Sequence, residues 1–200
     1  MDADEQLVDR PETWPVHGSE DALRGGMPFA VRVDEVSLPD DHETFSRLVI
    51  EHPGAVVVLA VDDEDRALVL RQYRHAVASR MVELPAGLLD EPGEDPLEAA
   101  RRELLEETGY AAEEWVHLNH LHNSPGFSSE VIDSFLARKL RRADRGDFRP
   151  EHEEADMTVH WVPVDDLVRA VLARQVTDGP LVSAVLTYVV AHGEGRDPGR

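Results

Sequence analysis

A cluster of three glutamates constrains this chain more than any other feature of its sequence. Glu103, Glu106 and Glu107 are spaced i, i+3 and i+4, so they share one face of a helix in which each residue turns about 100°. Like charges side by side repel and form no packing surface. Taken alone, the cluster more often marks a solvated acidic surface, but it also suits a hard divalent cation such as Mg²⁺, which shares oxygen ligands with substrate phosphates.

The residues around the cluster favour the metal interpretation. Nine positions over residues 87–110 occur in a fixed order: Gly87, Glu94, Arg102, Glu103, Leu104, Glu106, Glu107, Gly109 and Tyr110. They resemble the Nudix box, G-x5-E-x7-R-E-U-x-E-E-x-G-U, in which U is aliphatic or aromatic. Six residues rather than five separate the first glycine from the first glutamate. We place the extra residue in the LLDEPG loop, where an insertion has a small cost.

Local signals predict a loop, a helix and a second loop across this stretch. Asp95 or Glu94 suits the N-cap, Pro96 suits the first turn and Gly109 suits the C-terminal stop. Between them, an apolar stripe at helical spacing predicts the buried face: Leu97, Ala100, Leu104 and Leu105.

Segments that flank the box narrow the resemblance. The sequences RQYR at 71–74 and ELPAG at 83–87, and Pro125 fifteen residues after Tyr110, are similar to features of ADP-ribose pyrophosphatases, a subgroup of the Nudix hydrolases. The expected reaction is therefore hydrolysis of ADP-ribose to AMP and ribose 5-phosphate. Two alternatives stay open: another nucleotide sugar or dinucleotide as substrate, and a domain that senses a nucleotide without cleaving it.

The resemblance implies which residues form a metal and catalytic site. Mg²⁺, with Mn²⁺ as a substitute, would be held by three carboxylates and one backbone carbonyl: those of Glu103, Glu106, Glu107 and Ala86. Arg102 would orient the glutamates, and Glu107 would serve catalysis as well as metal binding. The general base would come from a loop before the last strand, where the role falls to Glu153, with its neighbour Glu154 as the alternative.

The resemblance also implies which residues contact the substrate. Arg47 and Arg74 match positions that contact phosphate or adenine, and a guanidinium group suits phosphate because it donates two parallel hydrogen bonds. Pro125 and Gly126 would belong to the substrate-binding loop. The chain has no cysteine, which excludes a disulfide framework and a thiolate site.

Composition and periodicity predict a mixed α/β protein, and the resemblance implies the Nudix α/β/α sandwich with a mixed sheet. We expect an N-terminal arm and β-hairpin at 1–50, a Nudix domain at 51–195 and a disordered tail at 196–200. Within the first segment, residues 1–27 show little periodicity and predict a loose arm, whereas alternation at 29–36 and 44–51 predicts the hairpin. By position, this hairpin would exchange between the subunits of a homodimer and cover the substrate.

Elsewhere the pattern predicts regular elements by length and periodicity. Strands are expected at 55–61, 67–73, 115–122, 131–140 and 157–162. Helices are expected from Asp165 or Asp166 to about 174, with one of these aspartates as the cap, and at 181–191. The basic segment at 139–145 is either a solvated hairpin end or a phosphate contact.

Three histidines follow one another in the predicted strand at 115–122. Alternation places His120 and His122 on one face and His117 on the other. No fourth ligand is evident, so we interpret them as a polar strand surface rather than a zinc site.

The net charge of the chain is −21. This charge argues against passive binding to nucleic acid or anionic membranes, both of which require positive charge. The first residues lack a basic segment followed by an apolar run, and no apolar run approaches the length of a membrane span. We therefore expect a cytoplasmic protein with a small-molecule substrate.

Overall fold

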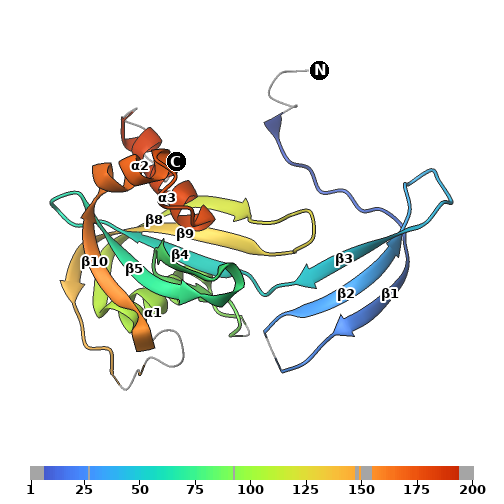
Figure 1. Ribbon diagram of the computed structural model, residues 1–200, viewed down its shortest axis with the longest axis horizontal. Helices are drawn as coiled ribbons and strands as arrows, with labels where there is room; N and C mark the ends of the chain where they lie inside the picture. The colour runs from blue at the N-terminus through green and yellow to red at the C-terminus, as the bar shows by residue number, and fades with distance from the viewer. Residues whose placement is uncertain (1–6, 27, 92, 147–148, 150–154, 194–200) are drawn as a thin grey trace. The chain divides into compact units, whose positions relative to one another are not determined.

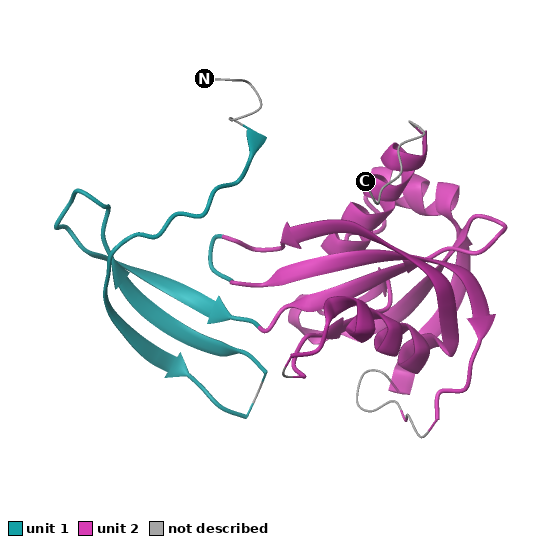
Figure 2. Cartoon of the chain, turned by 180° about the vertical axis from the view of Figure 1, so that it is seen from behind, with its two compact units in different colours: residues 1–52, 126–128 teal, residues 53–125, 129–200 magenta. Residues whose placement is uncertain are grey.

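The computed structural model describes residues 7–26, 28–91, 93–146, 149 and 155–193. The chain forms two compact units, coloured separately in Figure 2. Unit 1 comprises Met1–His52 and Gly126–Ser128, and unit 2 comprises Pro53–Pro125 and Ser129–Arg200. The predicted tail at 196–200 lies outside the described residues.

Unit 1 is a three-stranded antiparallel sheet in the order β1-β2-β3 (Figure 1). Its strands are β1 (Val16–Leu23), β2 (Ala30–Val36) and β3 (Phe45–Glu51). The prediction of a loose arm up to residue 27 was wrong for β1. The exposed and mostly polar segment VHGSEDAL forms a strand because its backbone pairs with the edge of β2, and such pairing does not require apolar alternation.

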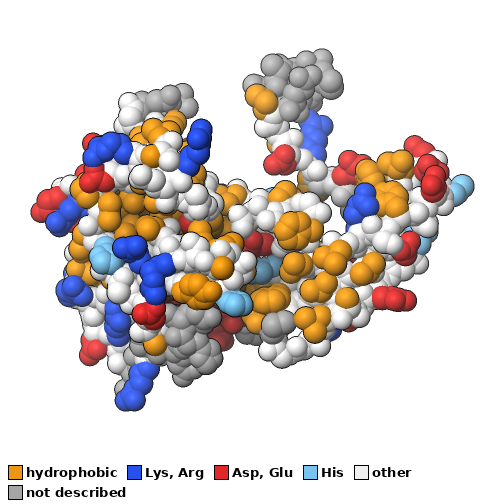
Figure 3. Space-filling view, in the orientation of Figure 1, with side chains coloured by type: hydrophobic (Ala, Val, Ile, Leu, Met, Phe, Trp, Pro, Cys, Tyr) orange, Lys and Arg blue, Asp and Glu red, His pale blue; other side chains and the backbone are white. Residues whose placement is uncertain are grey.

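The two faces of this sheet differ in chemistry. Directly paired residues share a face, and the pairs of Val31 with Leu23 and Ile50, and of Val33 with Leu48, form an apolar face. Leu48 remains 51% exposed. On the other face Arg32 forms ion pairs with Asp34 and Glu51, so that face is polar. Figure 3 shows hydrophobic side chains gathered over this sheet.

Unit 2 contains two sheets, in the orders β7-β4-β9-β8 and β10-β5-β6. The strands are β4 (Ala55–Ala60), β5 (Arg66–Arg74), β6 (Ser79–Glu83), β7 (Ala86–Leu88), β8 (Tyr110–His122), β9 (Val131–Arg142) and β10 (Thr158–Pro163). β4 pairs parallel with β9, whereas the other described strand pairs are antiparallel. The mixed sheet is therefore confirmed.

Helices cover both faces of these sheets (Figure 1): α1 (Pro96–Thr108) on one side, α2 (Val164–Leu172) and α3 (Gly179–Gly193) on the other. Strand β4 shows why. Its odd-numbered residues Val57 and Leu59 pack in a core with α2 and α3. Its even-numbered residues Val56 and Val58 pack in a second core with α1. The predicted α/β/α sandwich is thus confirmed.

The helix ends were predicted with mixed success. The Asp95 side chain accepts a hydrogen bond from the Leu97 backbone N–H (2.9 Å), and Gly109 ends α1 at a φ of 72°, as predicted. The predicted aspartate cap of α2 was wrong. That helix follows Pro163, and Asp165 and Asp166 lie in its first turn, where the helix dipole favours carboxylates.

Strand β8 starts earlier than predicted and contains a bulge between His117 and Asn119. The bulge changes the alternation, so His117 and His120 both contact the Asp133 carboxylate, at 2.7 and 2.9 Å. The prediction that they lie on opposite faces was therefore wrong. Both imidazoles are about half exposed, in agreement with a polar strand surface.

The basic segment at 139–145 contacts neighbouring elements of unit 2. Arg145 donates a hydrogen bond to the Glu107 carbonyl oxygen near the end of α1 (2.8 Å), and the Arg142 guanidinium lies 4.2 Å from the centre of the Tyr110 ring. A cation at a helix C-terminus stabilises the helix dipole. These contacts within unit 2 favour the interpretation of the segment as a hairpin end rather than a phosphate contact.

In the described chain, no helix has both the length and the apolar character that a membrane crossing requires.

Candidate active site

A cavity of about 980 Å³ in unit 2 brings the predicted acidic cluster together with residues from other elements. Helix α1 contributes Glu103, Glu106 and Glu107 to its wall. Polar lining from β5, β6, the β8–β9 loop and the residue before α3 includes Gln72, Arg74, Glu83, Asn123, Glu130 and Asp178. The fold thus places anionic and cationic groups around one space large enough for a nucleotide-sized ligand.

Arg102 connects the carboxylates of the box. Its guanidinium donates to both oxygens of Glu94, at 3.1 and 2.9 Å, to Glu103 at 2.6 Å and to Glu106 at 3.4 Å. The hydrogen bonds to Glu94 raise the pKa of Arg102 and lower that of Glu94. The extra loop residue therefore does not prevent Glu94 from reaching the arginine, and Arg102 is placed to orient the cluster.

The start of β7 packs closely against the same carboxylates. The Ala86 backbone N–H donates to the Glu107 carboxylate (3.0 Å), and Glu107 is only 6% exposed. A Cβ at Gly87 would lie 2.0 Å from the Glu103 carboxyl carbon. A larger residue at Gly87 would have to displace the Glu103 carboxylate, which gives a physical reason for glycine at the first position of the box.

The donor set fits a hard divalent cation, because it consists of carboxylate oxygens beside the backbone of Ala86. Within the described part of the chain, no three acidic or histidine side chains already converge as ion ligands do. Arg102 and the Ala86 amide instead hold the carboxylates through hydrogen bonds. The carboxylates are thus held by donors of the chain itself and do not form a preformed cage.

Arg74, predicted to contact substrate, lies in the cavity wall and is fixed by a buried acid. Its Nε and Nη2 donate to Glu83 at 2.9, 3.1 and 2.6 Å, which raises the pKa of Arg74. Gln72 donates to the same carboxylate (2.9 Å), and Glu83 is 5% exposed. The Arg74 side chain remains half exposed, so it is positioned and still accessible. The sequence reasoning missed Gln72 and Glu83, although the i, i+2 spacing of Gln72 and Arg74 signals a shared strand face.

Asp178 is a further cavity residue that the sequence reasoning missed. It precedes α3 and accepts a hydrogen bond from the Leu181 backbone N–H (2.9 Å). Burial, reinforced by the nearby negative charge of Glu83, raises the pKa of Asp178 to about 6. An aspartate before an apolar helix signals a cap, but nothing local in the sequence places it in this cavity.

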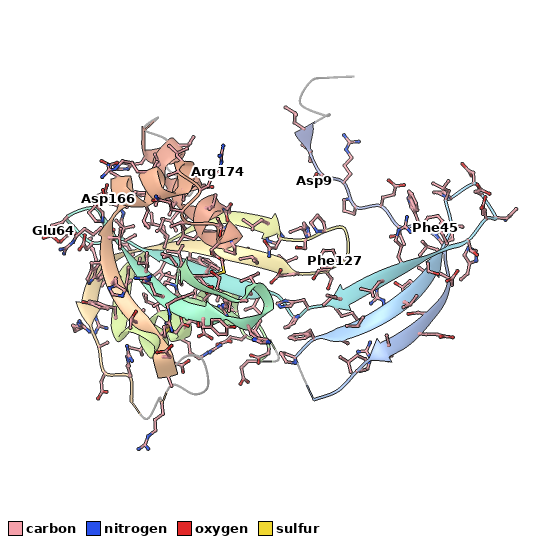
Figure 4. The ribbon with its side chains drawn as sticks, in the orientation of Figure 1. Asp9, Phe45, Glu64, Phe127, Asp166 and Arg174 are labelled. Atoms are coloured by element: carbon pink, nitrogen blue, oxygen red, sulfur yellow. The ribbon has the colours of Figure 1, made fainter. Side chains whose placement is uncertain are left out.

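The predicted loop and arm residues are placed less directly. Pro125 is exposed in the β8–β9 loop and is not among the residues that line the cavity, whereas Asn123 and Glu130 from that loop do line it. Gly126 is exposed in unit 1. Arg47 is also in unit 1, on β3, with its guanidinium 4.2 Å from the centre of the Phe45 ring, which Figure 4 labels. The substrate roles of these residues remain predictions.

The predicted general base cannot be placed. Glu153 and its alternative Glu154 both lie outside the described residues. The following residues lead into β10, which pairs with β5 through Thr158 and Arg71. The role of the two glutamates and the choice between them therefore stay predictions.

Comparisons with known proteins agree with this geometry. A family model described as the NUDIX domain matches residues 51–183. An ADP-ribose pyrophosphatase of Mycobacterium tuberculosis (strain ATCC 25618 / H37Rv) is 42% identical over 168 residues, 84% of this chain and 80% of that protein. An ADP-ribose pyrophosphatase of Bacillus subtilis (strain 168) is 35% identical over 84% of this chain and 88% of that protein. A crystal structure of an ADP compounds hydrolase shares the fold with a TM-score of 0.75 and 22% identity, covering 95% of this chain and 100% of that one.

Proposed function

Because this chain belongs to the Nudix family, we propose that it hydrolyses ADP-ribose to AMP and ribose 5-phosphate. The observation that carries the proposal is the single cavity that combines the α1 carboxylates with Arg74. A diphosphate requires both charge neutralisation and an oriented guanidinium group, and this cavity provides residues for each. The names of the two ADP-ribose pyrophosphatases that this chain resembles support the choice of substrate.

Mg²⁺ is the proposed cofactor, with Mn²⁺ as a substitute. Glu103, Glu106, Glu107 and the Ala86 carbonyl would hold it. When bound, such ions polarise a phosphoryl oxygen and lower the pKa of a water molecule. Arg102 would position the carboxylates, because its guanidinium donates hydrogen bonds to Glu94, Glu103 and Glu106.

The remaining chemistry is assigned to the chain's own side chains. Arg74, aligned by Glu83, would bind a phosphate oxygen through the part of its guanidinium that faces the cavity. Glu153 or Glu154 would take the proton from the attacking water, the usual task of a general base. Arg47, Pro125 and Gly126 would contribute to substrate binding.

We further propose that the protein is a homodimer and that unit 1 supplies the interface and a cover for the substrate. The apolar face of its three-stranded sheet supports this, because Leu48 and Leu23 are about half exposed. A sheet of three strands needs a second layer to bury its apolar face. A second copy of the chain provides that layer without another partner.

The proposal is tested by hydrolysis assays with Mg²⁺ on ADP-ribose, a GDP-sugar, a diadenosine polyphosphate and NADH. A preference for ADP-ribose with AMP as product is expected. A preference for another diphosphate would refute the substrate but keep the metal site. Nucleotide binding without turnover of any substrate would favour a sensor.

Two matched variants test the acidic site. Glu107→Gln should lower kcat by about 10²-fold or more, because it removes a ligand charge beside the reacting phosphate. Glu98→Gln is the control, since Glu98 lies on the same helix, pairs with Arg101 and does not line the cavity. Equal activity of Glu107→Gln and the control would contradict the metal assignment.

A further inference from the structure

The Asp178 side chain lines the cavity, and its role as a helix cap uses only one of its two carboxylate oxygens. It stands before α3, and one of its oxygens, Oδ2, accepts the hydrogen bond from the Leu181 N–H. Its carbonyl oxygen accepts from the Val182 N–H at 3.0 Å. Among the described residues, no other group donates a hydrogen bond to this side chain. The second carboxylate oxygen is therefore available to a ligand.

The groups around Asp178 define the kind of ligand atom that it can take. Two charged groups that act on Asp178, Glu83 and Arg74, already form an ion pair with each other. Gln72 also donates a hydrogen bond to Glu83. Glu83 thus already accepts hydrogen bonds from two side chains. Asp178 thus offers an acidic acceptor in the same cavity wall as Arg74, whose guanidinium suits phosphate.

The β8–β9 loop lies close to Gly179, the residue after Asp178. An ideal Cβ at Gly179 would lie 3.3 Å from Asn123 Oδ1, so this loop packs against the start of α3. Asn123 in turn donates to Glu130 (3.0 Å), and both residues line the cavity. Asp178, Asn123 and Glu130 therefore bring the start of α3 and the β8–β9 loop to the same cavity.

Helix capping alone does not account for a charged residue at this position. Asparagine caps a helix as well as aspartate does, and it would carry no charge next to Glu83. Burying a carboxylate beside another acid is unfavourable unless hydrogen-bond donors satisfy it. A ligand that brings hydroxyl donors to the free oxygen would satisfy it.

We propose that Asp178 determines specificity by accepting a hydrogen bond from the vicinal hydroxyls of a ribose next to the diphosphate. The inference rests on the proposed function. In ADP-ribose both sugars are bonded to the diphosphate, so Arg74 can hold a phosphate while Asp178 binds the adjoining diol. A carboxylate accepts and a hydroxyl donates, and such charge-assisted bonds are stronger than neutral ones.

The test measures kcat/KM for the wild type and Asp178→Asn on three substrates. These are ADP-ribose, an analogue that lacks the 2′- and 3′-hydroxyls of the adenosine ribose, and an analogue that lacks the 2- and 3-hydroxyls of the terminal ribose. The variant keeps the cap, because its amide oxygen can accept from Leu181, but it turns an NH₂ donor toward the cavity. We expect kcat/KM for ADP-ribose to fall about 10- to 100-fold, the usual range for a hydrogen bond to a charged group.

The analogues separate a direct contact from a general disturbance. The variant should lose at most about twofold on the analogue without the contacted hydroxyl, because the wild type has no bond to lose there. That analogue identifies which ribose meets Asp178. Asp178→Ser, which also caps helices, should show the same pattern.

Two results would overturn the inference. One is wild-type kcat/KM in both variants, and the other is an equal loss on all three substrates, which would indicate a structural effect. These failures differ from failure of the proposed function, which would appear as a wild-type protein inert toward ADP-ribose. That outcome would remove this inference as well.

Discussion

Asp178→Asn also leads to a prediction about stability, because the carboxylate that it removes is partly buried near Glu83. Its pKa is raised from 3.8 to about 6 in the folded protein. A carboxyl with a raised folded pKa favours the folded state while it is protonated, and this contribution is lost as the pH rises from about 4 through 6. Wild type should therefore become less stable relative to Asp178→Asn as the pH rises.

The magnitude follows from the size of the shift. A shift from 3.8 to about 6 is roughly two pKa units, and each unit corresponds to about 1.4 kcal/mol, so the full effect is at most about 3 kcal/mol above pH 7. At pH 5.0 the carboxyl is mostly protonated in the folded state, and the same relation gives about 1.6 kcal/mol. Asparagine preserves the cap, so the variant is expected to be the more stable protein at pH 8.0.

The assay is urea unfolding of both proteins at pH 5.0 and pH 8.0 with EDTA present, which excludes metal binding from the comparison. Taking the difference between the two proteins cancels the titration of the other acidic residues. The gap in unfolding free energy should grow by about 1.4 kcal/mol between the two pH values. A gap that does not change with pH, or a variant less stable than wild type at pH 8.0, would refute the buried-charge argument.

Three other predictions address the site and the interface. Gly87→Ala should lower kcat about 10²-fold, because its Cβ would displace an α1 carboxylate, whereas Gly193→Ala, with open space around it, should not. Glu83→Gln should raise KM for ADP-ribose about tenfold with little change in kcat, since Arg74 loses an ionic partner that aligns it. Leu48→Glu should convert the proposed homodimer to a monomer in analytical ultracentrifugation, because it places a charge on the apolar face of unit 1.

Each of these has a result that would count against it. Normal kcat in Gly87→Ala would mean that the Glu103 carboxylate can shift without loss of its function. A fall in kcat with unchanged KM in Glu83→Gln would assign that acid to chemistry rather than to positioning. Dissociation by Val159→Glu, an exposed apolar site on β10 of unit 2, but not by Leu48→Glu would place the interface elsewhere.

The box and its helix could be predicted because the interactions involved are local. Asp95 bonds to Leu97, Arg102 reaches residues within eight positions, and Gly109 ends the same helix. Such contacts depend on spacing along one element, which a sequence displays directly. The alternate packing of β4 residues on two cores follows from a period of two in the same way.

The rest of the site depends on register and packing between distant segments. Glu83 meets Arg74 because β5 and β6 pair antiparallel, and Asp178 reaches the cavity because α3 packs on the sheets. The bulge in β8 that turns His117 and His120 toward one aspartate, and the pairing of polar β1 with β2, are likewise decided by a neighbouring strand. A single residue's shift in register reverses which face a side chain occupies. The sequence alone therefore determined the acidic helix and its chemistry, whereas the tertiary structure decided which residues face it across the cavity.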